Sequence, residues 1–129
     1  MKKTAFVGVW LALGAGFAQA ASLSDDDRQF LGAYEKVRSA LAADDLTNAK
    51  GAASDLREDG AALAKSSSLK EARVAFEKLS DKAKKIAAGQ AGYYVVNCPM
   101  LKKDWIQNSE KISNPYFGKE MASCGEIKK

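Results

Sequence analysis

Residues 68–89, SLKEARVAFEKLSDKAKKIAAG, carry the clearest periodic pattern in the chain. Their apolar residues recur at spacings of three and four, which is the period of a helix that buries one face. Ser68 precedes the pattern, where a serine side chain can cap the first turn, and Gly89 follows it. We therefore expect a helix over residues 68–88. The apolar stripe of this helix consists of Leu69, Ala72, Phe76, Leu79, Ala83 and Ile86.

Two similar stripes precede this one and predict helices over residues 24–42 and 45–65. Ser24 and the three aspartates after it are typical of a helix start, and Asp44 or Asp45 can cap the second helix. Alanine is frequent on all three faces, which suits closely packed antiparallel helices with short connections. The sequence thus predicts an all-α fold, an antiparallel bundle of three main helices. The two further stripes are Phe30, Tyr34, Val37 and Leu41, and then Leu46, Ala49, Ala53, Leu56, Gly60 and Leu63.

The first 20 residues have the composition of a secretory signal peptide. Lys2 and Lys3 form a basic start, residues 5–17 are apolar without a charge, and Ala18-Gln19-Ala20 is a small-x-small cleavage site. The apolar run is shorter than the ~20 residues that span a bilayer. We expect residues 1–20 to be removed and residues 21–129 to form a single domain in the periplasm. No stable membrane insertion is expected after cleavage.

The composition argues against several classes of function. The chain has 129 residues, enough for one domain, and contains no histidine. Ser-His-Asp and Cys-His catalytic groups and imidazole metal sites are therefore excluded. The 20 Lys+Arg against 16 Asp+Glu include no basic patch interleaved with aromatic residues, so no nucleic-acid partner is expected. With no convincing acid–base pair or phosphate-binding glycine loop, we expect a protein that is not an enzyme.

The character of the chain changes after Gly89. Residues 93–96, YYVV, are aromatic and β-branched and favour an extended strand, and Pro99 biases Cys98 away from helix. Most aromatic residues of the exported chain follow. We expect residues 93–129 to form an irregular C-terminal cap on one end of the bundle. Its aromatic anchors would be Tyr94, Trp105, Tyr116 and Phe117.

This C-terminal part also holds every sulfur atom beyond the leader, in two short clusters. Cys98 and Met100 form one, and Met121 and Cys124 form the other. Thiolates and thioethers without imidazole are soft ligands that select Cu(I), and by the same chemistry Ag(I). If the clusters meet, the four side chains form a metal site for one Cu(I) or Ag(I) ion.

A disulfide between Cys98 and Cys124 is the more common outcome for such a pair of cysteines. Paired cysteines in an exported protein usually form a disulfide, and this one would stabilise the fold by roughly 3 kcal/mol. Met100 and Met121 would then fill space in the core. Both interpretations require Cys98 and Cys124 to lie close together. The residue pattern leaves the choice open.

The same stretch resembles a known family. The matching segments are residues 94–100 (YVVNCPM), Trp105, residues 112–118 (ISNPYFG), Met121 and residues 124–126 (CGE). This pattern is similar to a bacterial periplasmic helical domain family of unknown function, which also occurs appended to adaptor subunits of copper/silver efflux pumps. The resemblance implies a helical domain linked to heavy-metal handling and supplies no catalytic residue.

Two functions are therefore expected from the sequence. The first is periplasmic handling of Cu(I) or Ag(I) through the Cys/Met cluster, as a chaperone, a buffer or an efflux accessory, with a metal-efflux adaptor or another envelope protein as partner. The second is a disulfide-stapled helical module of the cell envelope that binds a protein and holds no metal.

Overall fold

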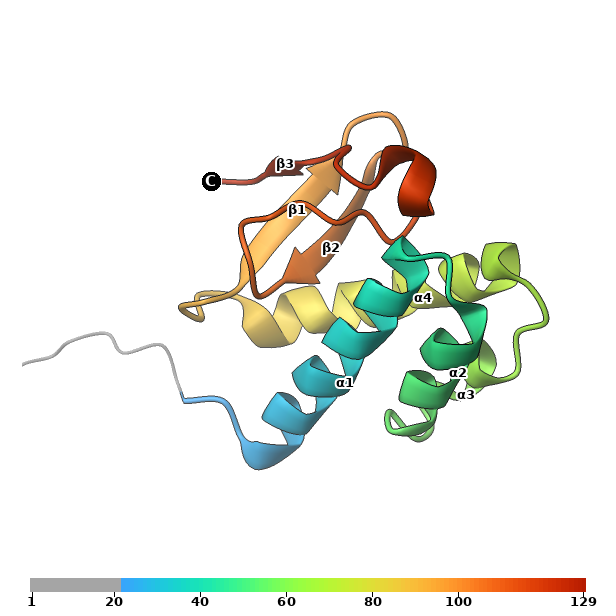
Figure 1. Ribbon diagram of the computed structural model, residues 1–129. Coiled ribbons are helices and arrows are strands. Elements are labelled where there is room, and N and C mark those ends of the chain that lie inside the picture. Colours follow the sequence, from blue (N-terminus) through green and yellow to red (C-terminus); the bar gives the residue numbers. More distant parts are fainter. Residues whose placement is uncertain (1–21) are drawn as a thin grey trace, which may run out of the picture.

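The computed structural model describes residues 22–129 of the chain (Figure 1). The expected signal peptide and the cleavage site before Ala21 lie outside these described residues. Within residues 22–129, no helix is both long enough and apolar enough to cross a membrane.

Four helices make up the first two thirds of the described chain. They are α1 (Asp25–Ala42), α2 (Leu46–Ser54), α3 (Ala61–Ala64) and α4 (Leu69–Ala87). The side chains of Ser24, Asp45 and Ser68 cap α1, α2 and α4 by accepting hydrogen bonds from backbone N–H groups three residues later, at 3.1, 3.0 and 3.1 Å. Such bonds satisfy N–H groups that the first turn leaves without a partner. The two long helices therefore begin where their capping residues predict.

The helix expected over residues 45–65 is interrupted. A turn separates α2 from α3, and Arg57 within it has a positive φ of 55°. Gly60 ends the turn so close to α2 that a Cβ atom there would lie 2.0 Å from the backbone oxygen of Ala53. The chain can fold back on α2 at this position because glycine has no Cβ atom. Any larger residue would collide with the preceding helix.

The predicted all-α bundle is wrong, because residues 94–127 contribute a three-stranded antiparallel sheet. Its strands are β1 (Tyr94–Cys98), β2 (Lys103–Gln107) and β3 (Glu126–Ile127), in the order β2-β1-β3. The β-branched and aromatic residues of β1 favour a strand, and the tight turn after it reverses the chain. In that turn Lys102 has a φ of 54° and its N–H donates to the backbone oxygen of Cys98 at 2.8 Å. The fold is therefore mixed α and β.

The sheet is covered on both faces. Because side chains alternate along a strand, Val96 and Trp105 share one face of the sheet while Asp104 and Ile106 share the other. Helix α4 packs against β2, with Lys84 of the helix 3.2 Å from the carboxylate of Asp104. The C-terminal segment after β2 crosses the opposite side (Figure 1). Only residues 108–125, which include the short 3-10 helix η1 (Gly118–Met121), keep the irregular character expected of the cap.

Three buried hydroxyl groups join the helices to the outer edge of β2. The hydroxyl of Tyr34 on α1 lies 2.8 Å from Oγ of Ser80 on α4 and accepts a hydrogen bond from the backbone N–H of Ile106. The hydroxyl of Tyr116 lies 3.2 Å from the same Ser80 oxygen and 3.3 Å from the backbone oxygen of Asp104. Burial raises the pKa of both tyrosines, so both stay neutral. The free edge of β2 is thereby hydrogen-bonded to side chains.

We expect Ser80→Ala to lower the free energy of unfolding by about 1–3 kcal/mol, because it removes a partner from two buried hydroxyls. Urea unfolding followed by circular dichroism measures this change. Ser39→Ala, at an exposed position of α1, is the matched control and should leave the midpoint nearly unchanged. Equal midpoints for the two variants would contradict a structural role for the hydroxyl cluster.

A second link ties the sheet edges together through Asp104. Its carboxylate accepts hydrogen bonds from Asn97 at 2.7 Å, from Lys128 at 3.1 Å and from Lys84 at 3.2 Å. Partial burial opposes ionisation, but these hydrogen bonds outweigh it and hold the pKa of Asp104 below its usual range. A carboxyl with a lowered pKa stabilises the fold above the pKa of the unfolded chain and loses this effect as the pH falls through the folded value.

We therefore expect Asp104→Asn to destabilise the protein at pH 7 by roughly 1–3 kcal/mol, the range for hydrogen bonds to a charged group. The difference between wild type and variant should shrink as the pH falls below the unfolded-state pKa of 3.8. Urea midpoints at several pH values between neutral and strongly acid test this. A difference that stays constant across that range would show that ionisation of Asp104 contributes nothing.

Candidate functional site

The fold brings the two cysteines together. Cys98 is the last residue of β1, and Cys124 lies two residues before β3. Strand β3 pairs with β1 through Val96 opposite Ile127 and Asn97 opposite Glu126. This register sets Cys124 beside the end of β1, with 3.8 Å between the two sulfur atoms and both thiols free. The pair therefore has the proximity that a shared ion and a disulfide both require.

The two thiols differ in their surroundings. Cys98 is fully buried, whereas Cys124 is partly exposed. Burial and the neighbouring Cys98 thiol raise the pKa of Cys124, because both disfavour a thiolate there. At neutral pH Cys124 is therefore a protonated thiol, and a metal ion that binds it displaces a proton. A reagent or an ion from solution reaches the pair from the side of Cys124.

The two methionines lie in different environments. Met100 lies in the turn between β1 and β2, and its side chain is 67% exposed. Met121 is the last residue of η1, is partly buried, and accepts a hydrogen bond at its backbone oxygen from the N–H of Cys124 at 3.0 Å. Among the four predicted ligands, the structure places the two cysteines in contact and Met121 in the same turn as Cys124. Met100 faces the solvent.

Asn114 fixes the backbone around Cys124. Its side-chain amide donates to the backbone oxygen of Cys124 at 2.8 Å, and its own N–H donates to Ala122 at 2.7 Å. The side-chain oxygen accepts from the N–H groups of Tyr116 and Phe117 at 2.8 and 3.3 Å. Asn114 is completely buried, so each of these bonds replaces one to water. The asparagine of the ISNPYFG segment is therefore a support for the thiol pair.

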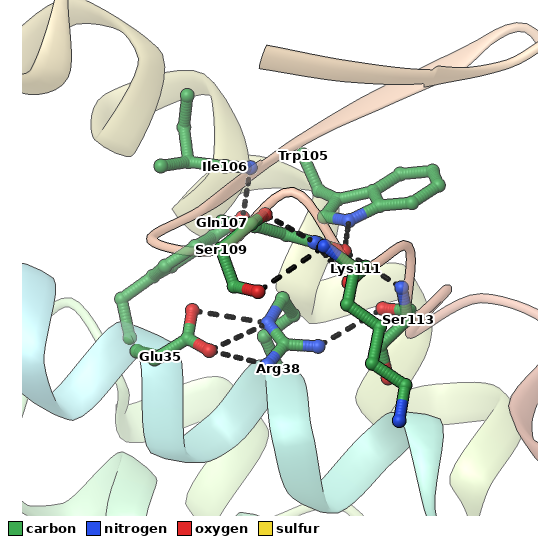
Figure 2. Close-up of polar contacts among 9 residues, drawn as sticks. Glu35, Arg38, Trp105, Ile106, Gln107, Ser109, Lys111 and Ser113 are labelled. Atoms are coloured by element: carbon green, nitrogen blue, oxygen red, sulfur yellow. Dashed lines mark hydrogen bonds and ion pairs between the residues drawn. The ribbon is translucent and has the colours of Figure 1, made fainter. Parts of the chain in front are cut away.

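Gln107 performs the same task for the segment between β2 and Asn114 (Figure 2). Its side-chain oxygen accepts from the indole N–H of Trp105 and from the N–H of Ser113, both at 2.8 Å. Its side-chain nitrogen donates to the backbone oxygens of Ser109 and Lys111 at 3.0 and 2.8 Å. All four hydrogen-bonding positions of this buried amide are used. The side chain of Gln107 thus holds the loop of residues 109–113 against the sheet.

Two arginines hold the same segment from the helices. Arg38 of α1, which is paired with Glu35, donates to the backbone oxygen of Ser113 at 3.0 Å (Figure 2). Arg73 of α4 donates to Pro115, to the backbone oxygen of Leu41 and to the carboxylate of Asp44, at 2.8, 2.8 and 2.7 Å. The sequence pattern does not predict these roles for Gln107 and the two arginines. A charged residue beside an apolar stripe, as Arg38 is beside Val37, is the only sequence signal of such a role.

The glycine of the ISNPYFG segment also has a structural reason. Gly118 has a φ of 65°, and a Cβ atom there would lie 2.0 Å from the carboxylate of Asp44. Asp44 accepts from Arg73 and from the N–H of Lys119, and these hydrogen bonds lower the pKa of its carboxyl. The close contact between η1 and Asp44, which lies in the turn between α1 and α2, thus requires glycine. In this segment Asn114, Pro115, Tyr116 and Gly118 all serve the fold.

The ligand set at the thiol pair is small. Within residues 22–129, no three Cys, Asp or Glu side chains gather into a group that could hold a metal ion, and the chain has no histidine. A metal–sulfur bond of about 2.3 Å bridges sulfur atoms 3.8 Å apart with an S–metal–S angle near ~110°. One ion can therefore bind both thiols without a rearrangement of the backbone.

Comparison of the chain with family models, with curated proteins and with solved structures gives no match. The family suggested by the sequence motif therefore remains a prediction.

Gly125 offers a test of how the thiol pair is positioned. A Cβ atom there would lie 2.8 Å from the ring of Trp105 and 3.0 Å from the side chain of Val96. We expect Gly125→Ala to push Cys124 away from the sheet at an overpacking cost of about 1–3 kcal/mol. The equilibrium constant for disulfide formation against glutathione should fall by about tenfold.

The matched control for this measurement is Gly51→Ala. A Cβ atom at Gly51 of α2 meets nothing within 4 Å. This variant should keep the wild-type equilibrium constant. If Gly125→Ala also keeps the wild-type equilibrium constant for disulfide formation, contact with Trp105 does not position Cys124.

Proposed function

We propose that this protein binds one Cu(I) or Ag(I) ion through Cys98 and Cys124 and handles that ion in the periplasm, as a chaperone, a buffer or an efflux accessory. The observation that carries the proposal is the pair of free thiols 3.8 Å apart. The leader over residues 1–20 supports export, and the resemblance of the C-terminal motif supports a link to metal efflux. A metal-efflux adaptor or another envelope protein is the proposed partner.

The chemistry of the pair suits a soft monovalent ion. Thiolates are strong soft donors, and thioethers add weaker bonds without adding charge. Zn(II) prefers four ligands, and neither an imidazole nor a cluster of carboxylates lies at this site in the described part of the chain. The burial of Cys98 shields one side of the ion from water, while the exposure of Cys124 leaves a route for exchange. Such a site favours transfer of an ion as well as storage.

The same short distance also favours the alternative, a disulfide-stapled interaction module without metal. A disulfide needs the sulfur atoms about 2.05 Å apart, so a small movement of two side chains closes the bond. Both thiols then lose their protons, and two electrons pass to a disulfide-bearing oxidant of the envelope. The oxidised pair has no thiolate left for a metal ion, so the two functions exclude one another in a single molecule.

Anaerobic Cu(I) titration of the reduced mature protein, with intact-mass measurement, tests the proposal. We expect one bound ion and near loss of binding in Cys98→Ser and in Cys124→Ser, because each removes a thiolate. Met100→Leu and Met121→Leu should weaken binding by less, since leucine keeps the bulk but removes a neutral, weaker donor. Zn(II) should compete poorly.

A thiol count on protein purified in air distinguishes the metal-binding function from the disulfide-stapled module. Two reactive thiols and tight Cu(I) binding support the metal function. The disulfide module is supported instead if the protein has no reactive thiols and if the reduced wild type binds Cu(I) no more tightly than a Cys98→Ser/Cys124→Ser variant. Equal Cu(I) affinities for the reduced wild type and the double Met→Leu variant would show that the thioethers are not ligands.

A further inference from the structure

A groove of about 340 Å³ lies between the first half of α4 and the turn that joins β1 to β2. Its lining residues are Lys70, Arg73, Val74, Leu101, Lys103 and Tyr116. Val74, which is 62% exposed, and Met100, which is 67% exposed, are the two large apolar residues in residues 22–129 with exposed side chains. Both lie at this groove or in the turn beside it. The two large exposed apolar side chains of the described residues therefore lie at or beside this groove.

One of the basic side chains at the groove carries a charge that no carboxylate in residues 22–129 pairs with. The lining of the groove includes three basic side chains and no carboxylate. Arg73 pairs with the carboxylate of Asp44 at 2.7 Å. Lys103 lies 3.2 Å from the carboxylate of Glu77 on α4 and 5.2 Å from the ring centroid of Tyr116. The ammonium group of Lys70 is exposed and makes no hydrogen bond or ion pair within the described residues. Lys70 thus leaves a positive charge at the groove that no carboxylate of the protein neutralises.

The shape of the site favours a polypeptide over a membrane. A bilayer surface is contacted by apolar side chains that protrude from a convex face. Here the buried Tyr116 and the partly buried Leu101 line the groove together with Val74, and the exposed side chains of Val74 and Met100 are separated along the chain on α4 and on the β1–β2 turn. The volume is at the lower end of the range for ligand pockets, and the exposed apolar surface continues past it onto Met100. An extended segment can fill the groove with one side chain and cover Met100 with the next.

We propose that this groove between α4 and the β1–β2 turn binds an acidic segment of a partner protein that carries an apolar anchor residue. A carboxylate of the segment pairs with Lys70, and the anchor packs against Val74 and Leu101. The surface contains neither cysteine, but it includes Met100, a weaker thioether donor of the proposed metal site, so the binding test is made on the metal-free protein. The surface begins in the same turn that follows Cys98, so a bound partner lies on the hairpin that carries one of the thiols.

The test uses fluorescence anisotropy with the full mature protein, reduced and metal-free, at low ionic strength. The probe is a labelled peptide with two adjacent leucines flanked on each side by glutamates. We expect saturable binding that weakens about fivefold or more in Lys70→Glu, where a charge pair is replaced by repulsion. Val74→Ser should also weaken binding. Lys85→Glu, an exposed position further along α4, is the matched control and should bind as wild type does.

Two further probes make the result decisive. A peptide with serines in place of the leucines should lose the binding, because the anchor is absent. Vesicles of phosphatidylcholine and phosphatidylglycerol should not sediment the protein. The proposal is overturned if the leucine peptide fails to bind, if the serine peptide binds equally, if Lys85→Glu weakens binding as much as Lys70→Glu, or if the vesicles bind and the peptide does not. Wild-type melting temperatures for the variants establish that each is folded.

Discussion

The hydroxyl cluster of Tyr34, Ser80 and Tyr116 is the contact on which the arrangement of helices and sheet depends. It is the place where α1, α4, β2 and the C-terminal segment meet, and all three hydroxyls are buried. A buried hydroxyl without a partner costs free energy, so only one relative placement of these elements satisfies all of them. The aromatic rings add to this restriction, since Tyr34 stacks on Phe76 with centroids 4.9 Å apart and Tyr116 contacts Trp105 edge to face. Apolar packing alone would tolerate small shifts between α4 and the sheet, whereas these directional bonds do not.

The thiol pair depends in turn on a strand of two residues. Strand β3 is too short to be stable by its own backbone pairing, so its position rests on side chains around it. Asn114 holds the backbone of Cys124, Gly125 lies against Trp105, and Lys128 pairs with Asp104. Together these contacts set the distance between the sulfur atoms. The residues of the motif around the cysteines thus serve largely to bring the two thiols together.

The helical part of the fold was more accessible from the sequence than the sheet. The stripes over residues 24–42 and 68–88 and their serine caps predict α1 and α4 to within one residue at each end. The turn in the expected second helix brings Gly60 so close to Ala53 that no side chain fits, and no periodicity reveals this contact. The residues at 93–96 favour a strand, but the sequences of β2 and β3, which pair with it, do not. Strand β2 reads KDWIQ, without clear alternation, and a positive φ at Lys102 rather than at a glycine makes the turn.

The required proximity of Cys98 and Cys124 followed from chemistry, whereas Gln107, Arg38 and Arg73 act through backbone oxygens that a sequence does not display.

The bonded edge of β2 limits how this protein can recognise another chain. Many domains bind extended peptides by adding a strand to a free sheet edge, where main-chain groups supply the affinity. Here the N–H of Ile106 and the oxygen of Asp104 already bond to tyrosine hydroxyls, and the opposite edge is the two-residue strand β3. Neither edge offers a row of open backbone groups, which also removes a template for edge-to-edge aggregation. Selectivity for a binding partner must therefore come from side-chain chemistry on the surface.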